Sequence, residues 1–314
     1  MANTAFWQMS PSHNALPWIN QKGWPDTMKK QMKVERKQEV LSLVTGLGYA
    51  KVPVWYNGTF TDLKMDLIIP KHREAHPACP AVLWLCGGAY RVVNHSIWMP
   101  EFVRLARAGF IVASAEYRTS SEARFPAPLI DVKAAIRYLK AHAADFCIDP
   151  DKIFVMGESA GGSLASLAGV TGGIPEFEQG EYLDVDSRVA GIVDFYGVTE
   201  MAKRSEDSSK SLPPNDDVPY FTMEEYLGVG YSDETAEKAS AISYVSANTP
   251  PTMILHGSAD FVVPIAQSEA FYEKLRENNV ETEFYIIEGA PHGDDLFYQD
   301  EVMDNVIAFL KKHC

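Results

Sequence analysis

Short apolar runs alternate with amphipathic stretches along most of the chain. Continuous apolar, β-prone runs, which are typical of strands buried on both faces of a sheet, occupy residues 81–85, 110–113 and 153–156. Leu129, Val132, Ile136 and Leu139 recur at i, i+3, i+7 and i+10, which places them on one face of a helix. Further strands are predicted at 189–195, 252–255 and 283–287. Further helices are predicted at 102–108, 266–277 and 301–312, and directly after Ser159. This alternation predicts a mostly parallel sheet covered by helices on both faces.

Two segments depart from this alternation. Asn57-Gly58 lies between β-prone runs at 49–56 and 60–69, which predicts a β-hairpin and therefore an antiparallel edge of the sheet. Residues 198–248 are first polar, then contain Pro213-Pro214, and end in an aromatic stretch. A connection of this length between core strands is usually functional or disordered. We expect a cap or lid inserted over the strand ends, and the alternative is a surface excursion away from the site.

The domain organisation follows from these segments. Residues 37–314 are predicted to form one catalytic domain that includes the cap, and residues 1–36 an N-terminal extension of unassigned function. Trp7, Trp18 and Trp24 of the extension are expected to pack on the main body, or else on a partner subunit of a homodimer.

Composition and charge narrow the function classes. The 314 residues are 46% hydrophobic, which suffices for one large α/β domain with an inserted cap. A net charge of −14 without a basic cluster argues against nucleic acid and anionic membrane surfaces as partners. No apolar run is long enough to cross a bilayer, and the first residues lack the pattern of a secretory signal. We therefore expect a cytoplasmic protein, unless a leader has been removed.

Candidate chemistry begins at residues 157–161, Gly-Glu-Ser-Ala-Gly. This G-x-S-x-G follows the strand at 153–156 and precedes a helix. A serine on so sharp a turn has a strained backbone and an exposed hydroxyl, and glycines are needed two positions either side because side chains there would collide. Ser159 is therefore the predicted nucleophile, with a turn that carries no chemistry as the alternative reading.

A serine nucleophile needs a base and a carboxylate that orients the base. Such partners come from loops at the carboxyl ends of later strands. Asp260 follows the strand at 252–255, and His292 follows the strand at 283–287. The chain order serine, aspartate, histidine is the one expected for an α/β-hydrolase.

Other ionisable residues near these positions are assigned structural roles. His256 lies too close to the end of its strand to act as the base, so we expect it to stabilise the loop. Asp294 and Asp295 follow the histidine on its own loop and are interpreted as a solvated or capping pair. Glu158 is expected to make a structural hydrogen bond rather than to act as acid or base.

Six motifs together carry a resemblance to a known family. They are Cys86-Gly87-Gly88-Ala89-Tyr90, Glu116-Tyr117-Arg118, Phe125-Pro126-Ala127-Pro128 with Asp131-Val132, residues 157–162, His256-Gly257 with Asp260, and Pro291-His292-Gly293. Over residues 50–312 the chain resembles the hormone-sensitive-lipase-like branch of the α/β-hydrolases, and within it the bacterial carbohydrate (acetyl xylan) and feruloyl esterases. The resemblance implies an α/β-hydrolase fold with an inserted cap.

The resemblance also implies an oxyanion hole. The backbone N–H groups of Gly88 and Ala89 would join that of Ala160 around the substrate oxygen. The family's loop usually reads His-Gly-Gly-Gly, whereas here Cys86 replaces the histidine and Ala89 the third glycine. A backbone donor survives the change to alanine if φ remains permitted. Cys86 is either a reactive thiol or a buried, apolar-walled cysteine.

The function that follows is a serine ester hydrolase that works through an acyl-enzyme, without metal or organic cofactor. The resemblance favours an acetyl group on a sugar or xylan-derived oligosaccharide, or a related small ester. Candidate substrate contacts are Tyr90, Trp98, Tyr220 and Phe221, whose rings could stack on the substrate or simply pack under the lid. Alternatives are a feruloyl esterase, an arylformamidase or a peptidase with the same triad. A non-catalytic binding protein of the same fold would be expected to have a broken triad.

Overall fold

The computed structural model describes residues 30–35, 37–55, 58–71, 77–203 and 223–314. The chain divides into two compact units, Met1–Gln38 and Glu39–Cys314. The predicted N-terminal extension falls within the first unit, and its three tryptophans lie outside the described residues. All of the structure below belongs to the second unit.

Eight strands form one sheet in the order β1-β2-β4-β3-β5-β6-β7-β8. The strands are β1 (Leu41–Pro53), β2 (Phe60–Pro70), β3 (Cys79–Leu85), β4 (Ile111–Ala115), β5 (Ile148–Glu158), β6 (Gly191–Phe195), β7 (Thr252–Gly257) and β8 (Thr282–Ile287). β1 pairs antiparallel with β2, and β2 antiparallel with β4, whereas all later neighbours are parallel. The mostly parallel sheet with an antiparallel edge is therefore confirmed.

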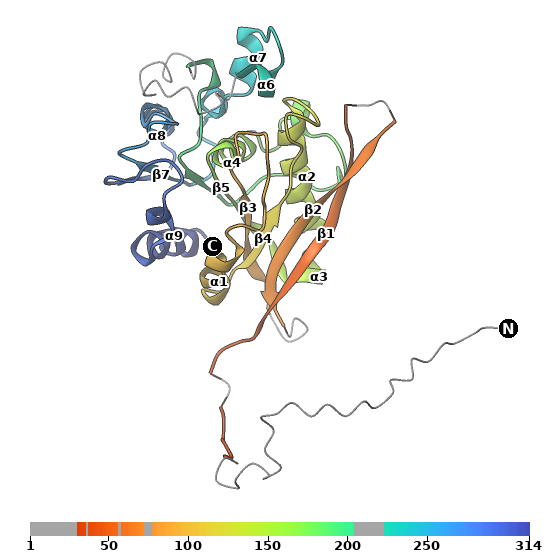
Figure 1. Cartoon of the computed structure of the whole chain (residues 1–314), viewed down its shortest axis with the longest axis vertical. Coiled ribbons are helices and arrows are strands. Elements are labelled where there is room, and N and C mark those ends of the chain that lie inside the picture. The colour runs from red at the N-terminus through yellow and green to blue at the C-terminus, as the bar shows by residue number, and fades with distance from the viewer. Residues whose placement is uncertain (1–29, 36, 56–57, 72–76, 204–222) are drawn as a thin grey trace, which may run out of the picture. The chain divides into compact units, whose positions relative to one another are not determined.

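Helices connect the strands, and short 3₁₀ turns fill the longer connections (Figure 1). The α-helices are α1 (Met99–Arg107), α2 (Ala127–Ala141), α3 (Ala143–Phe146), α4 (Ala160–Val170), α6 (Met223–Leu227), α7 (Asp233–Lys238), α8 (Ala266–Glu277) and α9 (Asp300–Lys312). The 3₁₀ turns are η3 (Pro175–Phe177), η4 (Met201–Lys203), η5 (Ala241–Tyr244) and η6 (Asp295–Tyr298).

The sheet separates two hydrophobic cores, which explains why its central strands are apolar throughout. In β3 the side chains alternate between the two faces, and every one from Ala81 to Leu85 is fully buried. Leu83 belongs to the core beneath α2, α4 and α8, whereas Trp84 belongs to the core beneath α1 and α9. Because both faces are covered by helices, an alternating polar pattern is absent from this strand.

The edge hairpin is longer than the sequence predicts. The pattern places the first strand at 49–56, but β1 begins at Leu41. The missed part contains Gly46 and Gly48, where the pairing register with β2 shifts. Gly46 has a φ of +67°, and its N–H donates to Asp66 Oδ1 over 2.8 Å. Two irregularities within one strand conceal its period-two pattern.

The described parts of the 198–248 segment are short helical turns that are fastened to the main body. The N–H groups of Thr199 and Glu200 donate to Oε1 of Gln267 on α8, over 3.1 and 2.8 Å. Figure 1 shows α6 and α7 together at one end of the unit. Tyr220 and Phe221, two of the candidate substrate contacts, lie outside the described residues. The cap therefore stays a prediction, although part of it lines the site described below.

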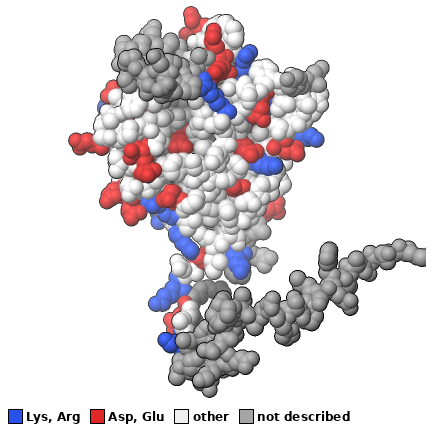
Figure 2. Space-filling view, viewed as in Figure 1, with Lys and Arg blue, Asp and Glu red and all other residues white. Residues whose placement is uncertain are grey.

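Charges of both signs are interspersed on the face of the main unit shown in Figure 2. Within the described ranges, none of the helices combines the length and the apolar character needed to cross a membrane. The same ranges hold no group of three or more His, Cys, Asp or Glu side chains that could bind a metal ion.

Candidate active site

Ser159 occupies a sharp turn between β5 and α4. Its φ and ψ are 51° and −119°, a conformation that is costly for a residue with a Cβ. A Cβ at Gly157 would lie 2.4 Å from the carbonyl oxygen of Gly161, and one at Gly161 would lie 2.0 Å from that of Leu85. Both contacts are shorter than any real Cβ tolerates, so the G-x-S-x-G spacing is a steric requirement of this turn.

His292 and Asp260 lie next to Ser159 although they come from separate loops. His292 Nε2 is 2.9 Å from Ser159 Oγ, and His292 Nδ1 is 2.7 Å from Asp260 Oδ2. When the proton of the neutral imidazole is on Nδ1, this N–H donates a hydrogen bond to the carboxylate of Asp260, and Nε2 is left free to accept a hydrogen bond from the hydroxyl of Ser159. The structure therefore brings together all three residues of the predicted triad in hydrogen-bonding order.

The environment of Asp260 keeps this side chain ionised. Burial alone would raise the pKa of this fully buried carboxyl, but hydrogen bonds from His256 and His292 and the charge of His292 lower it well below its ordinary value. The N–H groups of Val262 and Val263 also donate to its Oδ1, over 2.8 and 2.9 Å. A permanent negative charge at this position can orient His292 and stabilise its protonated form.

The residues assigned structural roles make structural contacts. His256 is fully buried and bonds Ser268 Oγ and the carbonyl oxygen of Val263, at 2.7 and 2.9 Å, so it supports the loop of Asp260 as predicted. The Asp294 carboxylate accepts the N–H of Leu296 and caps η6, which confirms its capping role.

Glu158 is the centre of a buried polar cluster beneath the turn. Its carboxylate accepts hydrogen bonds from Trp98 Nε1 at 2.8 Å and from the hydroxyls of Tyr196 and Tyr298, at 2.7 and 3.0 Å. The N–H of Gly87 also donates to it, at 3.3 Å. The predicted structural role of Glu158 is thus confirmed. Trp98, a candidate substrate contact, stacks on Tyr298 with ring centroids 3.9 Å apart and does not line the hollow beside Ser159.

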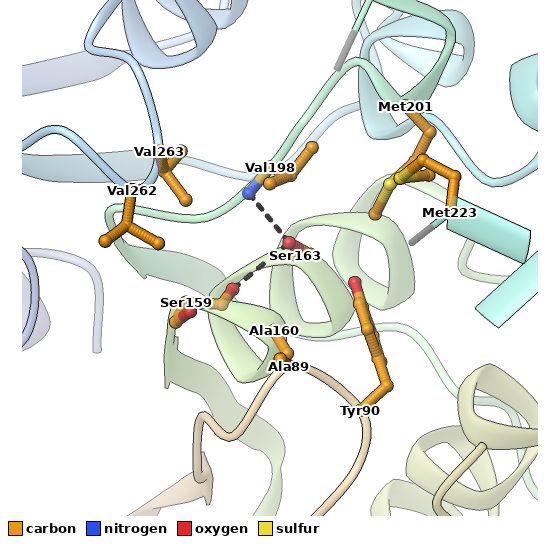
Figure 3. Close-up of a pocket in the computed structure, with 10 residues that line it drawn as sticks. All are labelled: Ala89, Tyr90, Ser159, Ala160, Ser163, Val198, Met201, Met223, Val262 and Val263. Carbon is orange, nitrogen blue, oxygen red and sulfur yellow. Dashed lines mark hydrogen bonds between the residues drawn. The ribbon is translucent and has the colours of Figure 1, made fainter. Parts of the chain in front are cut away.

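A mostly apolar hollow opens beside Ser159 (Figure 3). Its walls are formed by Ala89, Tyr90, Ser159, Ala160, Ser163, Val198, Met201, Met223, Val262 and Val263. Met201 and Met223 belong to the segment predicted as a cap, so its described part contributes to this site. Ser163 fixes the wall, because its Oγ accepts the N–H of Val198 at 2.7 Å and donates to the carbonyl of Ser159 at 3.1 Å.

Two of the three predicted oxyanion donors, Ala89 and Ala160, line the same hollow. Gly88, Ala89 and Tyr90 have positive φ angles of 132°, 52° and 57°. A Cβ at Gly88 would lie 2.1 Å from the carbonyl oxygen of Val92, so only glycine fits there. Ala89 stays within the left-handed region that an alanine can adopt. Among the described residues, the N–H groups of Ala89 and Ala160 have no hydrogen-bond acceptor and can serve a substrate oxygen.

Cys86, at the start of this loop, is a buried cysteine rather than an exposed one. Burial, with the charge of Glu158 as a second cause, raises the pKa of its thiol to about 12. A thiol that stays protonated at neutral pH is a poor nucleophile. Its carbonyl oxygen accepts a hydrogen bond from the hydroxyl of Tyr117 at 2.7 Å, which anchors the loop through its backbone.

The sequence gives no signal for several residues of the site. Val198, Met201 and Met223 are apolar residues in loops or short helices, where nothing distinguishes a pocket wall from a core contact. Tyr196 follows β6 with a φ of 44°, and its ring meets that of His292 edge-on at 4.7 Å. A positive φ at a non-glycine residue directly after a strand is visible only in the structure.

Asp194 lies directly behind the nucleophile turn. It is fully buried on β6 beside Gly157, and its Oδ1 accepts the N–H of Gly197 at 2.9 Å. A Cβ at Gly162 would lie 2.4 Å from the same oxygen, so α4 approaches this carboxylate closely. Burial raises the pKa of Asp194 to about 6.

This raised pKa predicts a pH-dependent stability. Between the unfolded pKa of 3.8 and the folded value of about 6, the unfolded chain ionises at Asp194 while the folded protein does not. The contribution of neutral Asp194 to the free energy of unfolding is therefore complete below the unfolded pKa. It is lost as the pH rises through the folded pKa. Asp194→Asn cannot ionise, so its free energy of unfolding relative to wild type should rise by about 2 kcal/mol from about pH 4 to about pH 7.5. Urea unfolding of both proteins across this range measures the difference, and a constant difference would contradict the prediction.

Comparisons with known proteins agree with this fold. The sequence profile of the BD-FAE family matches residues 65–275. The probable carboxylic ester hydrolase LipM of Mycobacterium tuberculosis is 33% identical over 200 residues, which are 63% of this chain and 45% of LipM. The chain spans about half the length of the curated relatives it matches.

Two solved structures share the architecture. A truncated carbohydrate esterase from gut microbiota superimposes with a TM-score of 0.73 at 29% identity, over 89% of this chain and 98% of that one. An acetyl ester-xyloside bifunctional hydrolase from Caldicellulosiruptor lactoaceticus gives 0.69 at 25% identity, over 85% and 97%.

The eight-stranded sheet and the serine on its strand-to-helix turn define an α/β-hydrolase fold. Since the profile covers more than half of the sequence, the chain belongs to the BD-FAE family. The family resemblance drawn from the six motifs is thus confirmed.

Proposed function

We propose that this protein is a serine carboxylic-ester hydrolase that removes short acyl groups, acetyl first, from a carbohydrate or related small ester. The observation that carries the proposal is the unbroken chain of hydrogen bonds from Ser159 through His292 to Asp260. The LipM relative and both structural neighbours carry ester-hydrolase names, which supports the same class of reaction.

The first half of the proposed reaction uses this chain of hydrogen bonds. His292 Nε2 takes the hydroxyl proton as Ser159 Oγ attacks the ester carbonyl. Asp260 holds the opposite ring nitrogen and stabilises the imidazolium that forms. His292 then passes the proton to the leaving alkoxide, which departs as the alcohol.

The second half repeats the chemistry with water. His292 takes a proton from a water molecule, the hydroxide attacks the acyl carbonyl, and the proton returns to Ser159 as the acid leaves. In both halves the N–H groups of Gly88, Ala89 and Ala160 donate hydrogen bonds to the carbonyl oxygen and stabilise the negative charge that develops on it. The carbon chain of the acyl group enters the apolar hollow lined by Val198, Met201 and Met223.

The proposal predicts a preference for short acyl chains. The hollow is walled by two methionines, and Ala89 adds a methyl group to the loop that faces it. One missing methylene changes the binding free energy by only about 1–3 kcal/mol, but a chain that does not fit is excluded more strongly. We expect kcat/KM for p-nitrophenyl esters to fall from acetate to butyrate and to be nearly absent for octanoate.

Met223→Ala provides the matched test of this wall. It should raise kcat/KM for butyrate relative to acetate, because truncation enlarges the hollow without touching the triad. A series that rises with chain length up to octanoate would contradict the acyl preference and favour a lipase-like enzyme. Acetylated xylo-oligosaccharides, methyl ferulate and N-formylkynurenine in the same panel separate the carbohydrate esterase from the feruloyl esterase and arylformamidase alternatives.

A further inference from the structure

The loop that carries Ala89 has an unusual backbone. Gly88, Ala89 and Tyr90 are three consecutive residues with positive φ, and two of them have a Cβ. Left-handed backbone costs free energy for such residues, so it persists only where the surroundings fix it. Since the N–H of Ala89 is a proposed oxyanion donor, whatever fixes Ala89 and Tyr90 also sets the geometry of the reaction.

One fixing contact is an ion pair between this loop and α6. Arg91 Nε lies 2.6 Å from Glu225 Oε2, and Arg91 Nη2 lies 2.9 Å from Glu225 Oε1. Two parallel hydrogen bonds of this kind define the orientation of both side chains, unlike a single-point contact. The two residues are 134 positions apart in the sequence, so α6 reaches the loop from a distant segment.

A second fixing contact is a ring stack next to that ion pair. The rings of Tyr90 and Tyr226 lie 3.8 Å apart and within 10° of parallel, and both residues are buried. Tyr226 is also held by a second segment, because its carbonyl oxygen accepts the N–H of Phe125 at 2.9 Å and the Phe125 ring meets its ring edge-on. α6 is therefore in contact both with the loop of Ala89 and with the segment that contains Phe125.

We propose that Glu225 and Tyr226 are positioning residues for the oxyanion hole, acting through Arg91 and Tyr90 on the backbone of Ala89. This inference rests on the proposed function and names the part of the 198–248 segment that completes its site. Neither residue is among those that line the hollow, so both act at one remove from the substrate.

A purely structural role for α6 makes a different prediction. If these contacts only held the segment in place, their loss would lower stability or weaken substrate binding, and KM would rise. A positioning role acts on the N–H of Ala89, which is engaged most strongly in the transition state, so kcat falls while KM stays nearly constant. Complete removal of an oxyanion donor costs about 10²–10³ in kcat, and a displaced donor should cost less.

A charge swap tests the ion pair. Arg91→Glu and Glu225→Arg should each lower kcat for p-nitrophenyl acetate by about tenfold with KM within about twofold. The double variant restores the pair in reverse and should recover kcat to within about threefold of wild type. Glu224→Arg is the matched control, because it makes the same charge change at an exposed position of the same helix and should leave kcat unchanged.

A transition-state analogue gives the second readout. A small alkylboronic acid forms a tetrahedral adduct with the serine, and one oxygen on the boron atom of this adduct enters the oxyanion hole. In the single charge variants the Ki of this inhibitor should therefore rise by the same factor by which kcat/KM falls. Tyr226→Phe keeps the stacked ring and should behave as wild type, whereas Tyr226→Leu should behave like the single charge variants. Glu225→Gln serves as the milder variant if either charge reversal fails to fold.

The outcomes separate this inference from the proposed function. Unchanged kcat in the charge variants, a loss confined to KM, or a double variant no better than the singles would each overturn the positioning role. Ser159→Ala decides the proposed function independently. If Ser159→Ala is inactive while the Glu225 variants behave as wild type, only the inference fails. If Ser159→Ala keeps its activity, the proposed function fails, and the inference that rests on it fails as well.

Discussion

Replacement of Ser159 by alanine is expected to abolish turnover of p-nitrophenyl acetate while leaving the thermal unfolding midpoint almost unchanged. The hydroxyl oxygen of Ser159 is the atom that would bond to the acyl group in the acyl-enzyme. Removal of a triad serine typically costs on the order of 10⁶ in kcat. Alanine at this position keeps the Cβ that the turn already accommodates, so the backbone conformation should persist. Steady-state kinetics and a thermal melt of the same preparation measure both quantities.

Ser163→Ala is the matched control for this prediction. Ser163 lines the same hollow one helical turn later, but its hydroxyl is engaged by Val198 and the carbonyl of Ser159. Its loss should reduce activity far less than the loss of the nucleophile. A Ser159→Ala variant that keeps a tenth of the wild-type rate would show that the nucleophile is another residue.

Replacement of Asp260 by asparagine is expected to lower kcat by about 10⁴, the loss that the corresponding change produces in a serine protease. Asparagine can donate to Nδ1 of His292 and so favour the wrong tautomer, with the proton on the nitrogen that should accept from Ser159. The charge that stabilises the imidazolium is lost as well. The rate should be measured on folded protein, because the same carboxylate also accepts the N–H groups of Val262 and Val263.

Asp294→Asn and Asp295→Asn are the comparison variants for this change. Asp294 caps η6 and Asp295 begins it, and neither makes a hydrogen bond or ion pair with His292 among the described residues. Both should keep activity within about a few-fold of wild type. A larger loss in either variant than in Asp260→Asn would show that the catalytic carboxylate lies on the loop of His292 and not at Asp260.

The sequence predicts the buried strands and the triad for related reasons. A strand such as β3 contacts both cores, so its apolar run is a direct record of its position in the sheet. Ser159, Asp260 and His292 stand at the carboxyl ends of parallel strands, and the fold brings those ends to one edge. Residue type and position in the strand order were therefore enough to group these three residues.

The parts that the sequence does not predict depend on tertiary contacts. The start of β1 at Leu41 is concealed by two glycines with shifted register. Met201 and Met223 look like any other apolar residues until the structure places them beside Ser159. The stack of Tyr90 on Tyr226 joins segments that are distant in the sequence, and the local sequence of neither segment predicts this contact.

The most direct test of the whole account is to trap the acyl-enzyme. The protein is mixed with p-nitrophenyl acetate, quenched with acid during the first turnover, digested and mapped by mass spectrometry, with Ser159→Ala treated in parallel. The account predicts one acetyl group on the peptide that contains Ser159, formed in proportion to the initial burst of p-nitrophenol, and no such adduct in the variant. Acetylation of another residue in step with the burst, or full turnover without any covalent acyl-enzyme, would contradict it.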